Sequence, residues 1–279
     1  MNECQFVKRI ESSELENLTA CLGSFIPGCG GVREASGFLT PTGAKVSLLG
    51  VKHIANSVAA LVNKLGIVLP SIVSRGLDQK CDAAEEISRV FNCHGSDKCV
   101  SHDYQLVYAE VFKQMPKEQK LSILEVGLGT QNRSLPSHMH TIFKPGSSLR
   151  ALKELFPSAD VFGADIDRDI LFQEDRITTA YVDQLDFGSF AVMQRAFGNP
   201  VYDLVIEDGL HSITASLNTL VFALSVTRQN GFIVLEDLTN YDDSWRIITA
   251  ALLACGHNAE LVNSNGLCLV VQVTGRRFV

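Results

Sequence analysis

The sequence predicts an α/β fold built on a mainly parallel sheet, preceded by a mainly helical N-terminal region. From residue 121 onward, short apolar runs alternate with longer amphipathic segments, which is the pattern of βαβ units. Several of these apolar runs end in acidic residues or closely spaced glycines. In an open parallel sheet, ligands bind beyond the carboxyl ends of the strands. The sequence therefore predicts one binding crevice shared by several strand ends.

The elements of the sheet domain follow from this alternation. Strands are expected at residues 121–127, 160–165, 177–182, 202–207, 231–236, 258–263 and 267–273. Helices are expected at 147–156, 187–197, 212–229 and 243–255. The last two strands flank the sequence Asn-Ser-Asn-Gly, which is typical of a hairpin turn. The expected sheet is thus parallel and finishes in a C-terminal antiparallel hairpin.

The N-terminal part of the chain lacks this alternation. We divide the chain into a mainly helical extension at residues 1–115 and a sheet domain at residues 116–279. Apolar spacing predicts helices at 44–69 and 102–114. The sequence Asp82-Ala-Ala-Glu85 resembles a capping box that opens a helix through Phe91, and a short helix is expected at 11–22. A lid over the binding crevice and a contact within a homo-oligomer are the two roles considered for this extension.

Composition narrows the class of protein. The 279 residues are 46% hydrophobic and 20% charged, which indicates a globular chain. A formal net charge of −7 argues against nucleic acid as a partner, because phosphate binding needs a basic surface. The polar, acidic start does not resemble a signal peptide, and no uninterrupted apolar run is long enough for a membrane helix. We expect a cytoplasmic protein without membrane contact.

One cluster of possible metal ligands lies between two expected helices. Four possible zinc ligands, Cys93, His94, Cys99 and His102, fall within ten residues, but this spacing fits none of the common zinc patterns. A polar turn is the expected structure. With no paired Cys-x-x-Cys motif, the eight cysteines are expected to be free thiols.

The first strand leads into Gly127-Leu-Gly129, with Glu125 two residues before the first glycine. The pair lacks the third glycine of the dinucleotide fingerprint. A carboxylate at 125 would repel a pyrophosphate but suits an ammonium group, such as that of S-adenosylmethionine (SAM). The other interpretation is a plain glycine turn. The long gap between Gly129 and Asp165 predicts a loop at 131–147 that forms a lid or a substrate wall.

Acidic residues at the next two strand ends fit an adenosine ligand. Asp165 is placed to bind the ribose hydroxyls, with Asp167 as the alternative. Asp183 and Gln184 are placed to contact the adenine amino group. Helix capping is the competing interpretation here, above all for Asp186.

The fourth and fifth strands end in Glu207-Asp-Gly-Leu-His211 and Leu235-Glu-Asp-Leu238. Adjacent strands would bring Asp208, Glu236 and Asp237 together, and such carboxylates repel one another unless a cation lies between them. Oxygen ligands suit Mg²⁺ or Mn²⁺. His211 is then a natural general base, because imidazole titrates near neutrality. The alternative is that these acids only cap helices.

These motifs, together with Gly163-Ala-Asp-Ile-Asp167 and Val182-Asp-Gln184, resemble the class I SAM-dependent methyltransferases. Within that class they are most similar to the macrolide-sugar O-methyltransferases and the cephalosporin-hydroxylase-like group, over residues 120–275. The resemblance implies a Rossmann-like sheet and SAM held by Glu125, Gly127, Gly129, Asp165, Asp183 and Gln184. It also implies Mg²⁺ near Asp208, Glu236 and Asp237, with Asp208 and His211 as the catalytic pair. Leu210 replaces the small residue usual in the family before this histidine.

The function expected from the sequence is SAM- and Mg²⁺-dependent O-methylation of a hydroxyl on a sugar or related polar small molecule. Such acceptors occur in natural-product and surface-polysaccharide biosynthesis. Three alternatives stay open: a metal-independent methyltransferase, a nucleotide-binding oxidoreductase, and a SAM- or nucleoside-binding protein without turnover.

Overall fold

A computed structural model describes residues 58–76 (without 59 and 63), 81–100, 102–116, 119–135, 137–238 and 242–275. The helix expected at 11–22 and most of the one expected at 44–69 lie outside these residues. Within the described part of the chain, no helix is long and apolar enough to cross a membrane.

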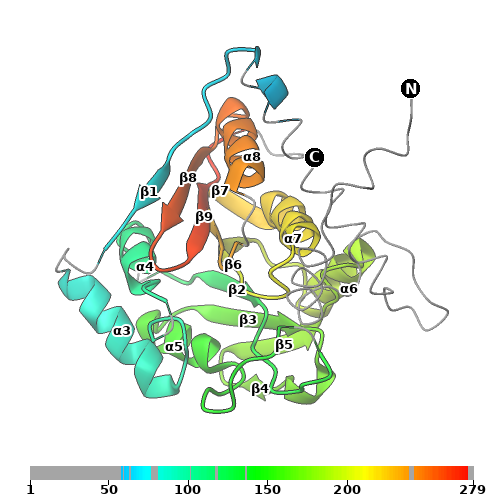
Figure 1. The fold of residues 1–279 in the computed structure, drawn as a ribbon. Helices are drawn as coiled ribbons and strands as arrows, with labels where there is room; N and C mark the ends of the chain where they lie inside the picture. The colour runs from blue at the N-terminus through cyan, green and yellow to red at the C-terminus, as the bar shows by residue number, and fades with distance from the viewer. Residues whose placement is uncertain are drawn as a thin grey trace, which may run out of the picture.

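One nine-stranded sheet forms the centre of the molecule (Figure 1). Its strand order is β1-β8-β9-β7-β6-β2-β3-β5-β4. Strands β7, β6, β2, β3 and β5 are mutually parallel, whereas β9 is antiparallel to both β7 and β8. The strands are β1 (Ile72–Ser74), β2 (Ser122–Val126), β3 (Asp160–Asp165), β4 (Gln173–Glu174), β5 (Ile177–Tyr181), β6 (Tyr202–Glu207), β7 (Thr227–Leu235), β8 (Asn258–Asn263) and β9 (Leu267–Gln272). The predicted parallel sheet with a terminal antiparallel hairpin is confirmed.

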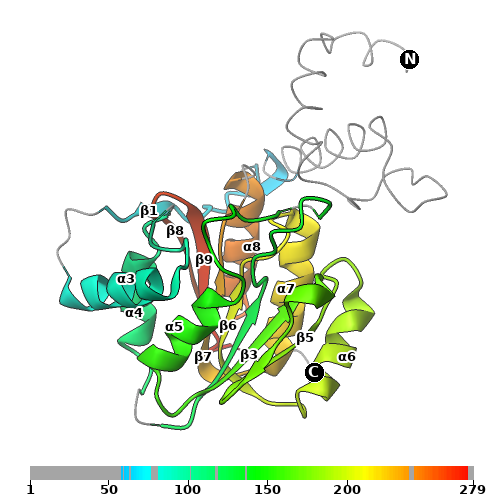
Figure 2. The same cartoon turned by 90° about the horizontal axis from the view of Figure 1, so that it is seen from below.

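Helices cover both faces of the sheet (Figure 2). One face is covered by α3 (Asp82–His94), α4 (Gln105–Phe112) and α5 (Ser147–Leu155), and the other by α6 (Phe187–Ala196), α7 (Ile213–Val226) and α8 (Asp242–Ala254). Each face buries its own apolar cluster, because a central parallel strand is apolar on both sides. The central strand β6 is buried at every position.

The structure differs from the sequence-based expectation at α7, β1 and β4. The helix expected to reach residue 229 ends at Val226, and β7 begins at Thr227. Thr227 is fully buried and pairs with Tyr202 of β6, so sheet pairing overrides helix propensity there. The sequence analysis predicted neither β1, which extends the sheet beside β8, nor the two-residue strand β4, which pairs with β5.

Residues 81–115 contribute to the same core as the sheet. Helices α3 and α4 bury Ile87, Phe91 and Tyr108 in the cluster that contains β2 and α5. Phe112 of α4 packs edge-on against Phe156, with ring centroids 4.9 Å apart. The expected boundary near residue 115 therefore does not separate two hydrophobic cores.

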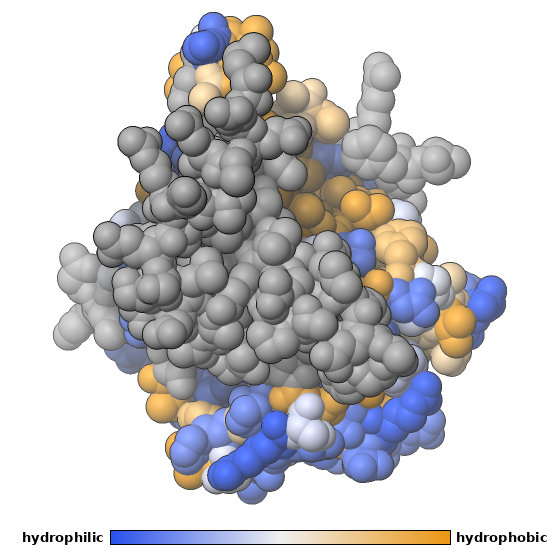
Figure 3. Space-filling model, turned by 45° about the vertical axis from the view of Figure 1, so that its right-hand side comes forward, coloured by the Kyte–Doolittle hydropathy of each residue, from blue (hydrophilic) through white to orange (hydrophobic). Residues whose placement is uncertain are grey.

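Exposed apolar side chains concentrate on residues 60–68, at the upper tip of the space-filling view (Figure 3). Val68 is 90% exposed, and Leu61, Leu65 and Ile67 are each about half exposed.

The Phe156→Ala variant tests how strongly α4 is joined to the sheet domain. Phe156 is completely buried, so its truncation should lower the free energy of unfolding by about 3–5 kcal/mol. Urea unfolding followed by circular dichroism measures this loss. Phe187→Ala is the matched control, because Phe187 is 50% exposed and its loss should cost less than about 1 kcal/mol. Equal losses in the two variants would contradict this account of the core.

Candidate functional site

A cavity of about 820 Å³ lies at the carboxyl ends of the parallel strands. It is placed where strand order reverses between β2 and β6, which is the expected position of a ligand site in such sheets. The residues predicted as functional that line it are Glu125, Gly127, Gly129, Asp165, Asp183, Gln184, Asp208, His211 and Asp237. Glu236 is not among the lining residues. The structure thus brings nine of the ten predicted positions to one cavity.

The turn after β2 needs glycine for two reasons. Gly127 has φ +98°, a conformation that side chains disfavour. A Cβ atom at this position would also overlap the backbone carbonyl of Asp208 in the turn after β6. The amide of Asp208 in turn donates to the carbonyl of Val126 at 2.8 Å. The first glycine therefore allows the two loops to touch backbone to backbone.

Asp165 lines the cavity and is fixed by backbone donors. Its carboxylate accepts from the amides of Leu128 at 2.7 Å and Asp167 at 2.8 Å. Burial raises the pKa of Asp165, although these hydrogen bonds oppose the shift. Asp167, the alternative considered from the sequence, is engaged elsewhere: its side chain bonds Thr130 and the amide of Asp169. Of these two acids, Asp165 is the one that lines the cavity.

The end of β5 carries Asp183, Gln184 and Asp186. Asp186 caps α6 by accepting from the amide of Gly188 at 3.0 Å, which confirms the capping interpretation for this residue. The side-chain carbonyl of Gln184 accepts from the amide of Leu210 at 2.8 Å, and its side-chain amino group donates to Glu207 at 2.8 Å. Gln184 thus supports the turn that carries His211, a role that the sequence did not indicate.

The turns after β6 and β7 have unusual backbone conformations. His211 has φ +52° and Asp237 has φ +49°, values uncommon for residues other than glycine. Both residues line the cavity. His211 Nε2 lies 3.9 Å from Asp208 Oδ1 and 3.9 Å from Asp237 Oδ2. One atom from each of the three residues falls within 4.8 Å of the others, close enough to hold a metal ion.

Glu236 has a different environment from the other two acids. It is fully buried, and its carboxylate accepts hydrogen bonds from Tyr108 and from the ammonium group of Lys98. Burial raises the pKa of Glu236, and the nearby charge of Asp208 adds to the shift that Lys98 opposes. Its expected role as a metal ligand therefore competes with two donors from the N-terminal part of the chain.

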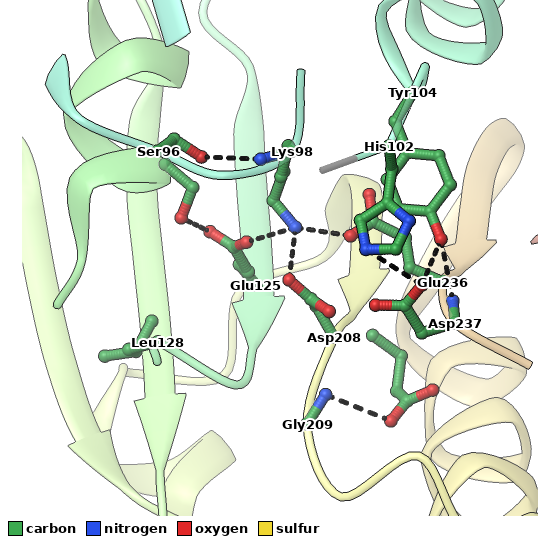
Figure 4. A network of polar contacts seen from close by, with 12 residues as sticks. Ser96, Lys98, His102, Tyr104, Glu125, Leu128, Asp208, Gly209, Glu236 and Asp237 are labelled. Atoms are coloured by element: carbon green, nitrogen blue, oxygen red, sulfur yellow. Dashed lines mark hydrogen bonds and ion pairs between the residues drawn. The ribbon is translucent and has the colours of Figure 1, made fainter. Parts of the chain in front are cut away.

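Lys98 is the site residue that the sequence analysis missed. The predicted polar turn between α3 and α4 exists, but it directs this lysine into the strand ends (Figure 4). Its Nζ lies 2.6 Å from Asp208 Oδ2, 3.1 Å from Glu125 Oε1 and within hydrogen-bonding distance of Glu236. Burial disfavours the ammonium form, but the three carboxylates outweigh it and hold the pKa of Lys98 well above its usual value. The same ammonium lowers the pKa of Asp208 against the effect of burial.

Tyr104, at the start of α4, is a further hydrogen-bond donor to the acids at the strand ends. Its hydroxyl donates to Asp237 Oδ1, and it accepts from the Asp237 amide at 3.2 Å. His102 Nε2 lies 3.5 Å from the same carboxylate oxygen. All three acids of the predicted metal site therefore meet a donor from residues 98–108. The excess of acidic residues at the strand ends was the only feature of the sequence that pointed to a segment with cations or hydrogen-bond donors opposite them.

Comparisons with known proteins were made for the sequence and for the fold. No family model matches the chain. It is 34% identical over 187 residues to 8-demethyl-8-alpha-L-rhamnosyl tetracenomycin-C 2'-O-methyltransferase of Streptomyces olivaceus, covering 62% of this chain and 46% of that protein. It is 32% identical over 123 residues to demethylmacrocin O-methyltransferase of Streptomyces fradiae, covering 44% and 28%. The chain thus spans less than half the length of these relatives.

The fold resembles that of MycE methyltransferase from the mycinamycin biosynthetic pathway. The TM-score is 0.55 at 22% identity for its complex with Mg and SAH, covering 68% of this chain and 55% of that one. A second complex, which also contains mycinamycin VI, gives a TM-score of 0.54 at 23% identity, with 71% and 56% coverage. The chain therefore has the fold of the class I SAM-dependent methyltransferases. The resemblance to macrolide-sugar O-methyltransferases predicted from the sequence is confirmed at the level of sequence similarity and fold.

The contact between the turns after β2 and β6 yields a prediction. Gly127→Ala should destabilise the protein by left-handed backbone strain and by separating the two turns, whereas Gly198→Ala carries the strain alone. Gly198 has φ +82°, and no atom lies within 4 Å of the position that a Cβ would take there. We expect Gly127→Ala to lose about 1–3 kcal/mol more than Gly198→Ala in urea unfolding. Similar losses would mean that the close approach of the turns is unimportant.

Proposed function

We propose that the chain is a SAM-dependent O-methyltransferase that acts on a hydroxyl of a sugar or related polar small molecule. The observation that carries this proposal is the position of His211. Its Nε2 lies between Asp208 and Asp237, in the same cavity as the glycine turn after β2. A base and a nucleoside-sized cleft thus share one space within a methyltransferase fold.

The cofactor end of the cavity would be formed by three strand ends. Gly127 and Gly129 leave room above β2, Asp165 offers carboxylate lone pairs beside β3, and Asp183 lies at the end of β5. Carboxylates in these positions suit ribose hydroxyls and an adenine amino group. When bound there, SAM would supply the methyl group.

Asp208 and Asp237 fit a divalent cation at the other end. With His211 they form the group of described residues whose ligand atoms are close enough to share one ion, and carboxylate oxygens suit Mg²⁺. In this proposal the two carboxylates hold the ion, and His211 Nε2 keeps its lone pair for the proton. A magnesium ion bound there would lower the pKa of an acceptor hydroxyl. Glu236 belongs to the predicted ligand set, but the donors on its carboxylate make Asp208 and Asp237 the better candidates.

Proton transfer is assigned to His211. Its Nε2 would accept the proton of the acceptor hydroxyl while the hydroxyl oxygen forms its bond to the methyl carbon and the carbon–sulfur bond breaks. Asp208 and Asp237, each 3.9 Å away, would stabilise the resulting imidazolium by charge. Holding the two reactants in line supplies much of the rate enhancement.

The proposed class of acceptor is inferred from the names of similar proteins and from the polar residues that line the cavity. The names of the similar curated proteins describe O-methylation of a rhamnosyl tetracenomycin and of demethylmacrocin. In this chain, Asp97 and His102 line the cavity, and we assign them to the side that would hold the acceptor. Polar side chains of this kind can hydrogen-bond several hydroxyls at once.

Metal-independent methyl transfer is the second candidate function. It is favoured by one observation: Lys98 already provides a positive charge within 3.1 Å of three carboxylates. In that case Asp208 and Asp237 would position the acceptor directly.

His211→Ala tests the assignment of the base. Loss of general-base catalysis should lower kcat by about 10²–10⁴-fold, while the SAM dissociation constant measured by calorimetry changes by less than about threefold. His94→Ala is the matched control, since His94 pairs with Glu154 outside the cavity. Retained turnover in His211→Ala would refute the base. No heat from SAM with the unaltered protein would refute the methyltransferase proposal itself.

Metal removal separates the two candidate functions. Treatment with EDTA should abolish methyl transfer to a hydroxylated sugar acceptor, and added Mg²⁺ should restore it, because the metal activates the hydroxyl. Calcium, which is larger and more loosely coordinated, should restore less activity. Full activity in EDTA would favour the metal-independent reaction.

A further inference from the structure

The ammonium group of Lys98 is an enclosed positive charge that the proposed reaction does not use. Its side chain is only 3% exposed. It enters the site from the turn between α3 and α4, whereas the acids that it contacts stand at the ends of β2, β6 and β7 (Figure 4). Three carboxylates surround it at ion-pairing distance. Such a position is costly for any cation that is not fully paired.

Lys98 divides the carboxylate oxygens into two groups. The inner group consists of Asp208 Oδ2, Glu125 Oε1 and the Glu236 oxygen that Lys98 contacts. The other oxygen of Glu236 accepts from Tyr108, and the other oxygen of Glu125 accepts from Ser148. Each oxygen of the two buried glutamates thus contacts an ammonium or hydroxyl group of the protein, Glu125 Oε1 through the ion pair alone.

The outer group faces the cavity. Asp208 Oδ1 and Asp237 Oδ2 are the oxygens paired with His211, and the oxygens that Lys98 contacts are different ones. The group of described residues that could share a metal ion is Asp208, His211 and Asp237, without Glu236. The space between Asp208 and Glu236 is already filled by an ammonium group, which would repel a second cation.

We propose that Lys98 is a positioning residue that occupies the inner carboxylate site as a fixed cation and confines a divalent ion to Asp208 and Asp237, beside His211. Glu236 then serves as the counter-ion of Lys98 rather than as a metal ligand. This inference depends on the proposed function only for the presence of a divalent ion in the site.

Mn²⁺ binding to the purified 279-residue chain tests the inference without SAM or acceptor, with electron paramagnetic resonance reporting free Mn²⁺. In Lys98→Met, the inner carboxylates lose their cation and become available to the metal. We expect Mn²⁺ to bind at least about tenfold more tightly than to the unaltered protein. A lysine with a purely structural role would give unchanged or weaker binding, and either result would overturn the inference. Lys120→Met is the matched control, because Lys120 is exposed and pairs with Asp160 at the surface.

If Lys98→Met does not fold, the double variant Lys98→Met/Glu236→Gln tests whether Glu236 is a metal ligand. It removes both members of the buried pair, a change that proteins tolerate better than loss of one partner. The local charge is unchanged, so Mn²⁺ affinity should stay within about threefold of that of the unaltered protein. Binding weaker by more than about tenfold would identify Glu236 as a ligand and overturn the proposal.

The failures of the two proposals can be told apart. Absence of Mn²⁺ binding to the unaltered protein would overturn this inference together with the metal in the proposed function. Normal binding with no gain in Lys98→Met would overturn this inference alone. Tighter binding in Lys98→Met, in a protein that neither binds SAM nor transfers methyl groups, would support the role of Lys98 and refute the methyltransferase proposal.

Discussion

The charge balance at the carboxyl ends of β2, β6 and β7 is the constraint on which much of this structure depends. Glu125, Asp208 and Glu236 converge there, and Lys98 is the cation that contacts all three. Removing one member of a buried ion pair typically costs about 3–5 kcal/mol. The turn that carries Lys98 must therefore dock against the strand ends, and α3 and α4 dock with it.

A second constraint is backbone strain at two residues that line the cavity. Left-handed conformations at His211 and Asp237 cost on the order of 1–3 kcal/mol each and persist only where neighbouring groups enforce them. Gln184 holds the turn before His211 through the amide of Leu210, and Tyr104 holds Asp237 through side chain and backbone. The site geometry thus depends on hydrogen-bonding side chains at the end of β5 and the start of α4, far from these turns in sequence.

Sequence patterns predicted the elements that depend on residues close together in the chain. Buried strands, their acidic ends and the terminal hairpin follow from apolar alternation and turn residues, and nine predicted residues line one cavity. Lys98 could not be found in this way, because a lysine in a polar turn has no local pattern that distinguishes burial from exposure. The strand β1 and the end of α7 at Val226 were missed for a related reason, since partners distant in sequence determine both. The adjacent acids were interpreted as evidence for a metal, and a protein cation satisfies the same electrostatic requirement.

The two cations considered for this site need not exclude each other. A fixed ammonium can balance the buried glutamates, while Asp208 and Asp237 each keep one oxygen on the cavity side, near His211. Asp208 belongs to both groups, with one oxygen on Lys98 and the other near His211. A divalent ion at the outer position would therefore be held by a carboxylate whose orientation Lys98 already fixes. In the proposed reaction, such preorganisation would place the acceptor hydroxyl, the base and the charge in a defined relation before methyl transfer begins.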